Sequence, residues 1–358
     1  MILVTPPFQQ LNTLNALVFS INIFLANNSE PINSRPIARL SGGDLKIGQG
    51  SLSRRGLFYQ FEYEIMTRTI LITGVTGQQG GSLLKALQSN PDASSLSIRA
   101  IVRDPTAASQ KLSSKSNSNL TFHKANLTDK SSLIPALTDV DTAFLFTIPQ
   151  PNAEAEITQG KAFIDAAKET GLKYIIFSSV GSAERNTGIP HFDSKRVVEK
   201  YIIESGIPYT FIRPVAFMDN FPVDGGVGRF FALGLFNTAL AGKRLQLIAA
   251  KDIGEFAAKA ALNPEKWKGR EFELAGDELS LPEVLDVYEK VQGTRPWSVW
   301  LPYFALKLML PVDFFLMFKF FYDDGYKANI PDLKKEYPGL QTFEDFLREK
   351  AKSKDKTA

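Results

Sequence analysis

The sequence predicts an α/β protein with a doubly wound parallel sheet and a smaller C-terminal cap region. Apolar strand-like runs alternate with helical segments from residue 69 to residue 221, at the spacing of βαβ units. The first run, Ile70 to Ile72, leads into a turn with three regularly spaced glycines and then into a helix. Because such units form parallel sheets with right-handed crossovers, we expect a ligand site at the carboxyl ends of the strands.

The individual elements can be located by their apolar patterns. The expected strands lie at residues 70–72, 96–103, 120–129, 141–149, 173–184 and 208–221. The first helix follows the glycine turn and carries the apolar stripe Leu83, Leu84 and Leu87. Further helices are expected at residues 130–137, 157–171 and 192–206, and Gly171 is suited to end the second of these.

Beyond residue 222 the alternation loosens, which predicts the cap. An amphipathic helix is expected at residues 251–267, then a strand and a helix within 270–293 that Ser280 and Pro282 open. The Phe-rich and Met-rich segment 302–326 is interrupted by Pro311, Asp313 and Lys319, which argues against a membrane span. We therefore expect a dinucleotide-binding core at 66–222, a cap interleaved with it at 223–350, and a charged tail at 351–358.

The first 65 residues are expected to stand outside this fold. Met1 to Ser29 contains no charged residue, so it lacks the basic segment that opens a secretory signal. Residues 30–60 are rich in Ser, Gly, Pro and Arg and show no strand or helix period. We interpret residues 1–65 as a disordered extension or a gene-model artefact, in preference to a targeting segment.

The composition narrows the classes of function. The 358-residue chain has 41 basic and 38 acidic residues and a net charge of +3, which does not indicate nucleic acid as a direct ligand. The absence of cysteine excludes disulfides and thiolate metal sites, and the two histidines, His123 and His191, are too few for a histidine metal cluster. We expect no metal site and a protein of the cytoplasm that can also be present in the nucleus. The oligomeric state is left open.

The glycine turn predicts a dinucleotide site. Gly74, Gly77 and Gly80 directly follow a strand and open a helix, where two glycines permit a tight turn and the third permits close packing of the helix. Free amides at the helix start would bind a pyrophosphate. At the end of the second strand, Arg103 would pair with a 2′-phosphate, which favours NADP(H) over NAD(H), unless Arg103 is only a solvated charge paired with Asp104.

Several segments in the right order resemble the NmrA-like proteins, atypical relatives of the short-chain dehydrogenases. They are ITGVTGQQGGSLLKAL after the first strand, IPHFDSK, RPVAFMDNF, KDIGEFAAKAALNPEKWKGREFELAGDELS and DLKKEYPGLQTFEDFL. The resemblance spans residues 66 to 350 and implies an NAD(P)-binding Rossmann fold. Some fungal members are regarded as oxidoreductases of secondary metabolism, and others, like the NmrA regulators, are regulatory.

The resemblance also implies which residues contact the cofactor. The pyrophosphate turn, the 2′-phosphate and adenine contacts, and the nicotinamide side would be formed by Gly74, Val75, Thr76, Gly77, Gln78, Gln79, Gly80, Arg103, Asn126, Leu127, Thr147, Ile148, Pro149, Lys161, Lys195, Phe217, Met218, Asp219 and Asn220. Asn126 departs from the aspartate that family members often have, but an amide still bonds an adenine edge. His123 belongs to no motif and is expected at a strand edge.

A histidine replaces the usual proton donor. His191 stands four residues before Lys195, where many related reductases have a tyrosine and a lysine. An imidazole must be protonated to act as a comparable acid, so the exchange weakens the usual mechanism without abolishing it. The catalytic candidates are His191, Lys195 and Ser178, or its neighbour Ser179, as a carbonyl-orienting group.

Two functions fit these features. The first is an NADP(H)-dependent reductase of a small, largely apolar carbonyl or enone. The second is a non-catalytic NADP(H) redox sensor that binds and regulates a protein partner such as a transcription factor. The expected partner is thus either a small-molecule substrate or a regulatory protein, and we expect no association with a membrane.

Overall fold

The computed structural model describes residues 45–47, 51–53, 56–58, 61–63, 68–112, 119–148, 153–299 and 303–355. The chain divides into two units, Met1–Thr67 and Arg68–Ala358. In the first unit, β1 (Leu45–Ile47) pairs antiparallel with β4 (Phe61–Tyr63), and β2 (Ser51–Ser53) with β3 (Gly56–Phe58). The sequence pattern did not indicate these short strands, which are three residues each.

The second unit is built on a seven-stranded sheet in which all neighbouring strands are parallel. Its strands, in spatial order, are β13 (Glu271–Leu274), β10 (Tyr209–Pro214), β9 (Tyr174–Ser178), β8 (Thr142–Phe146), β5 (Thr69–Thr73), β6 (Ser97–Val102) and β7 (Leu120–Lys124). The chain order therefore reverses between β5 and β8, which is the switch point where doubly wound sheets bind ligands. The predicted fold class is confirmed.

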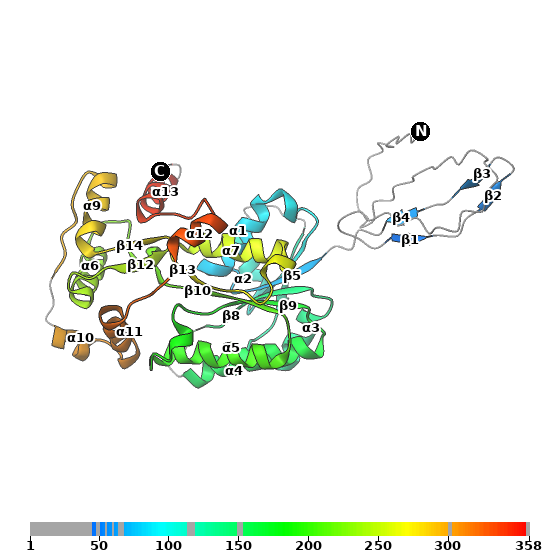
Figure 1. The fold of residues 1–358 in the computed structure, drawn as a ribbon, viewed down its shortest axis with the longest axis horizontal. Coiled ribbons are helices and arrows are strands. Elements are labelled where there is room, and N and C mark those ends of the chain that lie inside the picture. Colours follow the sequence, from blue (N-terminus) through cyan, green and yellow to red (C-terminus); the bar gives the residue numbers. More distant parts are fainter. Residues whose placement is uncertain are drawn as a thin grey trace. The chain divides into compact units, whose positions relative to one another are not determined.

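Helices cover both faces of this sheet (Figure 1). One face carries α1 (Gln78–Ser89), α2 (Pro105–Leu112) and α7 (Ala250–Leu262), and the other carries α3 (Lys130–Leu137), α4 (Ala153–Glu169) and α5 (Pro190–Ser205). The helices on each face pack closely: a Cβ at Gly254 of α7 would lie 2.4 Å from the backbone of Ser82 in α1. The predicted stripe Leu83, Leu84 and Leu87 is buried against the sheet.

The cap contains a second, three-stranded sheet. In it β12 (Leu245–Ile248) pairs parallel with β11 (Ala216–Phe217) and antiparallel with β14 (Asp277–Leu279). The cap helices are α6 (Val227–Leu240), α9 (Leu281–Gln292), α10 (Tyr303–Met309), α11 (Val312–Asp323) and α13 (Phe343–Asp355). The short helices of the unit are η1 (Pro91–Ala93), η2 (Ala183–Arg185), η3 (Met218–Asn220), α8 (Pro264–Trp267) and α12 (Ile330–Glu336).

The Phe-rich segment folds as two cap helices separated at Pro311. Phe318, Phe320 and Phe321 are buried in the cap core, whereas Phe314 is half exposed. Among the residues that the structure describes, no helix is both long and apolar enough to cross a bilayer.

The chain beyond residue 222 returns to the large sheet. β13 lies within the segment expected to form the cap, yet it is the seventh strand of the core sheet, next to β10. The start of α9 is as expected: the Ser280 amide and hydroxyl both donate to Glu283, at 2.8 and 2.7 Å.

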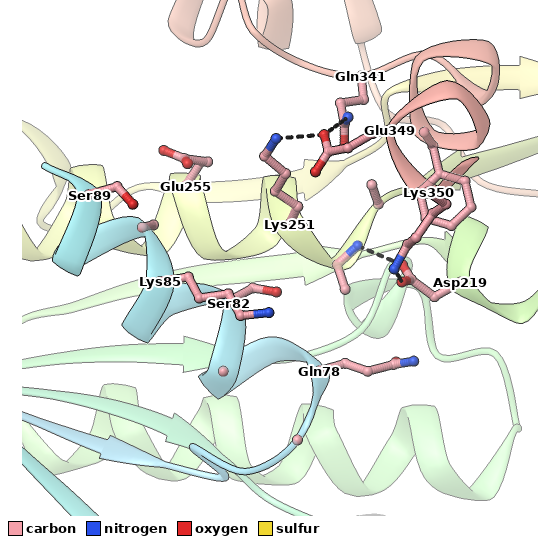
Figure 2. Close-up of a pocket in the computed structure, with 16 residues that line it drawn as sticks. Gln78, Ser82, Lys85, Ser89, Asp219, Lys251, Glu255, Gln341, Glu349 and Lys350 are labelled. Carbon is pink, nitrogen blue, oxygen red and sulfur yellow. Dashed lines mark hydrogen bonds and ion pairs between the residues drawn. The ribbon is translucent and has the colours of Figure 1, made fainter. Parts of the chain in front are cut away.

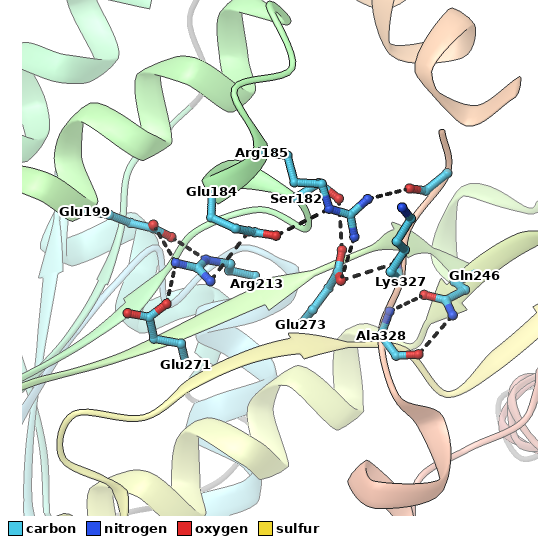
Figure 3. A network of polar contacts seen from close by, with 11 residues as sticks. Ser182, Glu184, Arg185, Glu199, Arg213, Gln246, Glu271, Glu273, Lys327 and Ala328 are labelled. Carbon is cyan, nitrogen blue, oxygen red and sulfur yellow. Dashed lines mark hydrogen bonds and ion pairs between the residues drawn. The ribbon is translucent and has the colours of Figure 1, made fainter. Parts of the chain in front are cut away.

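A network of ion pairs and hydrogen bonds joins β10, β13 and the segment after α11 (Figure 3). Arg213 of β10 is 8% exposed and forms two 2.8 Å hydrogen bonds to Glu199 of α5. It also pairs with Glu271 at 2.7 Å and Glu184 at 3.5 Å. A second group joins Glu273 of β13 to residues 182, 185 and 327. Such pairing compensates the cost of burying the charges.

Candidate functional site

The glycine turn has the geometry of a phosphate cradle. Gly74 adopts a φ of +63°, and the Gly77 amide donates to its carbonyl at 2.9 Å. A Cβ at Gly80 would lie 2.5 Å from the Gly74 oxygen, so only glycine lets α1 begin this close to β5. Gly77 is the N-cap of α1 and offers no side-chain acceptor, which leaves the first-turn amides and the positive helix end to an anionic ligand.

Two cations lie beside this turn. Arg103 follows β6 and is exposed, and among the described residues no ion-pair partner is found for it. The carboxylate of Asp104 instead caps α2, where it accepts from two backbone amides at 2.9 and 3.1 Å. From the last turn of α2, Lys111 donates to the Thr76 carbonyl at 3.0 Å, so it reaches the glycine turn itself.

The predicted adenine contacts lie at the end of the next strand. Asn126 is exposed after β7, and its side-chain oxygen accepts from the Thr128 amide at 3.1 Å in a local turn. Leu127 is half-buried against the core. His123 lies on β7, which is the edge strand as expected, and burial, followed by the charge of Arg99, lowers its pKa.

Lys195 is the centre of a buried polar group at the ends of β8 and β9. Its side chain is 4% exposed and pairs with Glu156 of α4 at 2.9 Å. It also donates to the Thr147 carbonyl and hydroxyl at 3.0 and 2.8 Å. Glu156 in turn accepts from Thr147 at 2.8 Å and from Ser194 at 2.6 Å. Burial lowers the pKa of Lys195, and the charge of Glu156 opposes that shift.

This arrangement holds the end of β8 in place. The neighbouring Ile148 is 45% exposed, and its amide and carbonyl are both bonded to the side chain of Gln159, at 3.1 and 3.3 Å. Pro149 lies outside the described residues. Glu156 and Gln159 were not among the predicted site residues, although both lie near the start of α4. The helix was expected to begin at residue 157, one position after Glu156.

The serines after β9 are enclosed. Ser178 is fully buried, and its hydroxyl donates to the side chain of Gln79, the second residue of α1. Ser179 is 4% exposed, and its hydroxyl has no hydrogen-bond partner among the described residues. Of the two hydroxyls, that of Ser179 is therefore the one not engaged by another described residue. Gln79 is turned inward and links the glycine turn to β9.

His191 is held by a carboxylate from the cap. Its Nδ1 lies 2.7 Å from Oδ1 of Asp313, in the first turn of α11, and the two side chains are 19% and 30% exposed. The ring also lies 6.4 Å from that of Phe314. Asp313 stands 122 residues from His191, and no sequence motif points to this pairing.

The remaining predicted residues have mixed positions. Met218 is fully buried in the cap core, Phe217 is half-buried and Asn220 is exposed. Asp219 accepts from the Ala250 amide at 2.9 Å and so caps α7. Lys161 is set apart from the other predicted residues, because it lies on the exposed face of α4 with its ammonium 5.7 Å from the centre of the Tyr201 ring.

A polar cleft of about 340 Å³ opens beside the glycine turn (Figure 2). It runs along α1 and is closed by the start of α7 and by α13. Ion pairs join its walls, from Lys251 to Glu349 at 2.6 Å and from Lys350 to Asp219 at 3.3 Å. Since α7 and α5 cover opposite faces of the sheet, this cleft and the Lys195 group flank the turn from different sides.

The described part of the chain contains no cluster of three or more His, Cys, Asp or Glu side chains that could hold a metal ion. The chemistry that the site offers is thus anion binding at the turn, fixed hydrogen bonds around Lys195, and a histidine–carboxylate pair at the junction with the cap.

Comparison with known families agrees with this geometry. The model of the NmrA-like family matches residues 66–347. The chain belongs to the NmrA-like family. The matched range includes the glycine turn, the Lys195 group and the cap, so the resemblance inferred from the motifs is confirmed.

Relatives of the chain include enzymes and regulators. An NmrA-like oxidoreductase, FrzB of Cladobotryum sp, is 27% identical over 257 residues, which is 64% of this chain and 75% of that protein. The nitrogen metabolite repression protein NmrA of Emericella nidulans is 24% identical over 267 residues, 69% of this chain and 72% of that protein. The structure of Citrobacter sp. triphenylmethane reductase with NADP(H) matches with a TM-score of 0.63 and 22% identity, covering 79% of this chain and 99% of that one.

Proposed function

We propose that this protein is an NADP(H)-dependent oxidoreductase that reduces a small, largely apolar carbonyl or enone. The observation that carries the proposal is the glycine turn at the switch point, whose free helix amides would bind a pyrophosphate. The relative named as an oxidoreductase and the NADP(H)-bound structural neighbour support it. A place in fungal secondary metabolism belongs to the same proposal.

The choice of NADP(H) rests on Arg103 and Lys111. Asp104 caps α2 through its Oδ1, and no ion pair between Asp104 and Arg103 is found among the described residues, which argues against a simple Arg103–Asp104 pair. A ribose 2′-hydroxyl would have to compete with two α2 amides for Oδ1 of Asp104. Lys111 reaches the glycine turn, and Arg103 would supply a second cation for a 2′-phosphate.

The bound dinucleotide would supply a hydride, and the residues of the chain would do the rest. The turn and α1 would hold the phosphates, and Thr147 with the exposed Ile148 would present the end of β8 to the nicotinamide side. Lys195 already has protein acceptors, so its main contribution is to fix this strand end. His191 is the group that can exchange a proton.

Calorimetric titration of the full chain with NADPH, NADP⁺ and NADH tests this proposal. We expect tight binding of the phosphorylated pair and a loss of about 1.5–3 kcal/mol in Arg103→Ala, with NADH binding unaffected. Arg68→Ala is the matched control, because it removes an exposed arginine at the opposite end of β5, where Arg68 only bonds a carbonyl. Equal losses for NADPH and NADH would contradict the role of Arg103.

The alternative is an NADP(H) sensor that binds a regulatory protein. The enclosed Lys195 and Ser178 favour it, since both are bonded to protein groups, and a relative is a repression protein. His191→Ala distinguishes the two: it should strongly reduce turnover of an enzyme and leave partner binding by a sensor unchanged. Partner binding that is equal with NADP⁺ and NADPH would exclude sensing.

A further inference from the structure

We propose that Asp313 is the positioning residue of His191 and that the pair is the proton-transfer unit of the site. This inference rests on the proposed oxidoreductase function and adds to it a residue from the cap. It also explains how a histidine can occupy the position at which related reductases have a tyrosine.

The contact between the two side chains is short and specific. Asp313 Oδ1 lies 2.7 Å from His191 Nδ1 and also 3.4 Å from the His191 backbone nitrogen. The adjacent Phe192 is buried in the cap core and packs edge-on against the imidazole, with ring centres 4.7 Å apart. The ring is thus held on one side by a carboxylate and on another by a fixed aromatic group, so its orientation is set by α11 as well as by its own helix.

The hydrogen bond determines which ring nitrogen can act. A carboxylate only accepts, so the proton of a neutral ring is held on Nδ1 and Nε2 carries the lone pair. Among the described residues, no hydrogen-bond partner of Nε2 is found. Nε2 is therefore the atom that can exchange a proton with a ligand.

The charges of the pair suit a histidine. A phenol becomes negative when it gives up its proton, so a neighbouring lysine assists it, whereas an imidazole is positive before it gives up its proton and requires a negative neighbour. Here Lys195 is tied to Glu156 and Thr147 beneath the strand ends. Asp313 supplies the negative charge at the other end of the ring.

The reaction balances with these groups. The bound dinucleotide would supply a hydride to the carbonyl carbon as the C–O π bond breaks, and His191 would give the proton on Nε2 to the carbonyl oxygen. The carbonyl is reduced to an alcohol and the dinucleotide is oxidised. The neutral ring, still protonated on Nδ1, then regains a proton from water.

Nitrogen-15 NMR of the imidazole rings tests the pairing without any turnover. The chain has only two histidines, so His191→Gln assigns the spectrum. For the neutral ring we expect the Nδ1-protonated tautomer in the wild type and in Asp313→Asn, whose amide oxygen can still accept, but the Nε2-protonated tautomer in Asp313→Ala. Asp323→Ala is the matched control, because it removes a carboxylate that pairs with Lys319 at the far end of α11.

Turnover of 9,10-phenanthrenequinone, a planar apolar dicarbonyl, with NADPH supplies the second measurement. We expect kcat to fall about 10²-fold in Asp313→Ala and about 10-fold in Asp313→Asn, with an unchanged KM for NADPH and no effect of the control. An Nε2-protonated ring in the wild type, or unchanged kcat in Asp313→Ala, would refute the proposal. A wild type that binds no NADPH in calorimetry would refute the proposed function and the proton transfer with it, while NMR would still report the pair.

Discussion

Replacing Asp252 with Asn is expected to remove a pH-dependent loss of stability. Asp252, in the first turn of α7, is fully buried. One carboxylate oxygen accepts from the Gln341 amide at 3.0 Å, and the other has no partner among the described residues. Burial raises the pKa of this carboxyl from 3.8 to about 7; the Gln341 amide and Lys251 oppose the rise, and Glu255 and Glu349 add to it.

The sign and size of this change in stability follow from the linkage between proton binding and folding. The folded protein binds the proton more tightly than the unfolded chain, so the free energy of unfolding decreases as the pH rises from about 4 to about 7 and is constant above. A shift of about three units corresponds to about 4 kcal/mol over the whole window, and about 2–3 kcal/mol of this lies between pH 5 and pH 8. The amide of Asn does not titrate, but its NH₂ group replaces the unpartnered oxygen, at a cost of about 1–3 kcal/mol.

Urea unfolding of both proteins at several pH values between about 5 and 8 measures the difference. The free energy of unfolding of Asp252→Asn minus that of wild type should rise by about 2–3 kcal/mol between pH 5 and pH 8. This rise is expected whatever the difference between the two proteins is at pH 5. Asp286→Asn, an exposed carboxylate on α9, should show no such gain. If the stability difference between wild type and Asp252→Asn is independent of pH, the carboxyl is not neutralised by burial and the reasoning is wrong.

Two further substitutions test the glycine turn and the ion-pair network. In Gly80→Ala, the new Cβ would lie 2.5 Å from the Gly74 oxygen, so the turn must shift. Calorimetry should therefore show that the affinity for NADPH falls at least about tenfold. The control Gly228→Ala, whose Cβ would meet nothing within 4 Å, should bind NADPH normally. Arg213→Leu leaves the buried carboxylate of Glu199 without its cation and should lower the free energy of unfolding by about 3–5 kcal/mol in urea, against less than about 1 kcal/mol for the exposed Arg348→Leu. Normal NADPH binding by Gly80→Ala, or equal stability losses in the two arginine variants, would count against these explanations.

The sequence was sufficient to predict those structural features that depend on residues close together in the chain. The strand, glycine turn and helix from Thr69 to Ser89 follow from apolar periodicity and from backbone conformations that only glycine adopts. The C-terminal turn of α4 at Gly171 and the box that opens α9 at Ser280 were visible because the groups that satisfy a helix end lie within a few residues of it. The family motifs, which occur in the expected order along the chain, supported the assignment of these features to one fold.

The tertiary structure decided how distant segments meet. Strand β13 fell within the segment expected to form the cap, because a short run of alternating glutamates and apolar residues does not say which sheet it will join. In the structure it pairs with β10, where Arg213 of β10 contacts Glu271 of β13. Glu156 beneath Lys195 could not be foreseen either, since a helix acid shows its role only when a buried cation faces it.

The same limit applies to the chemistry of the site. From the sequence by itself we predicted that an imidazole, His191, takes the position of the proton donor and that Arg103 ends the second strand. Only the folded chain showed that Asp104 caps a helix, that Arg103 has no ion-pair partner in the described part of the chain, and that Asp313 is brought against His191 across 122 residues. Local patterns fix conformations within a few residues, whereas the partner of a charged side chain is fixed by the packing of whole elements.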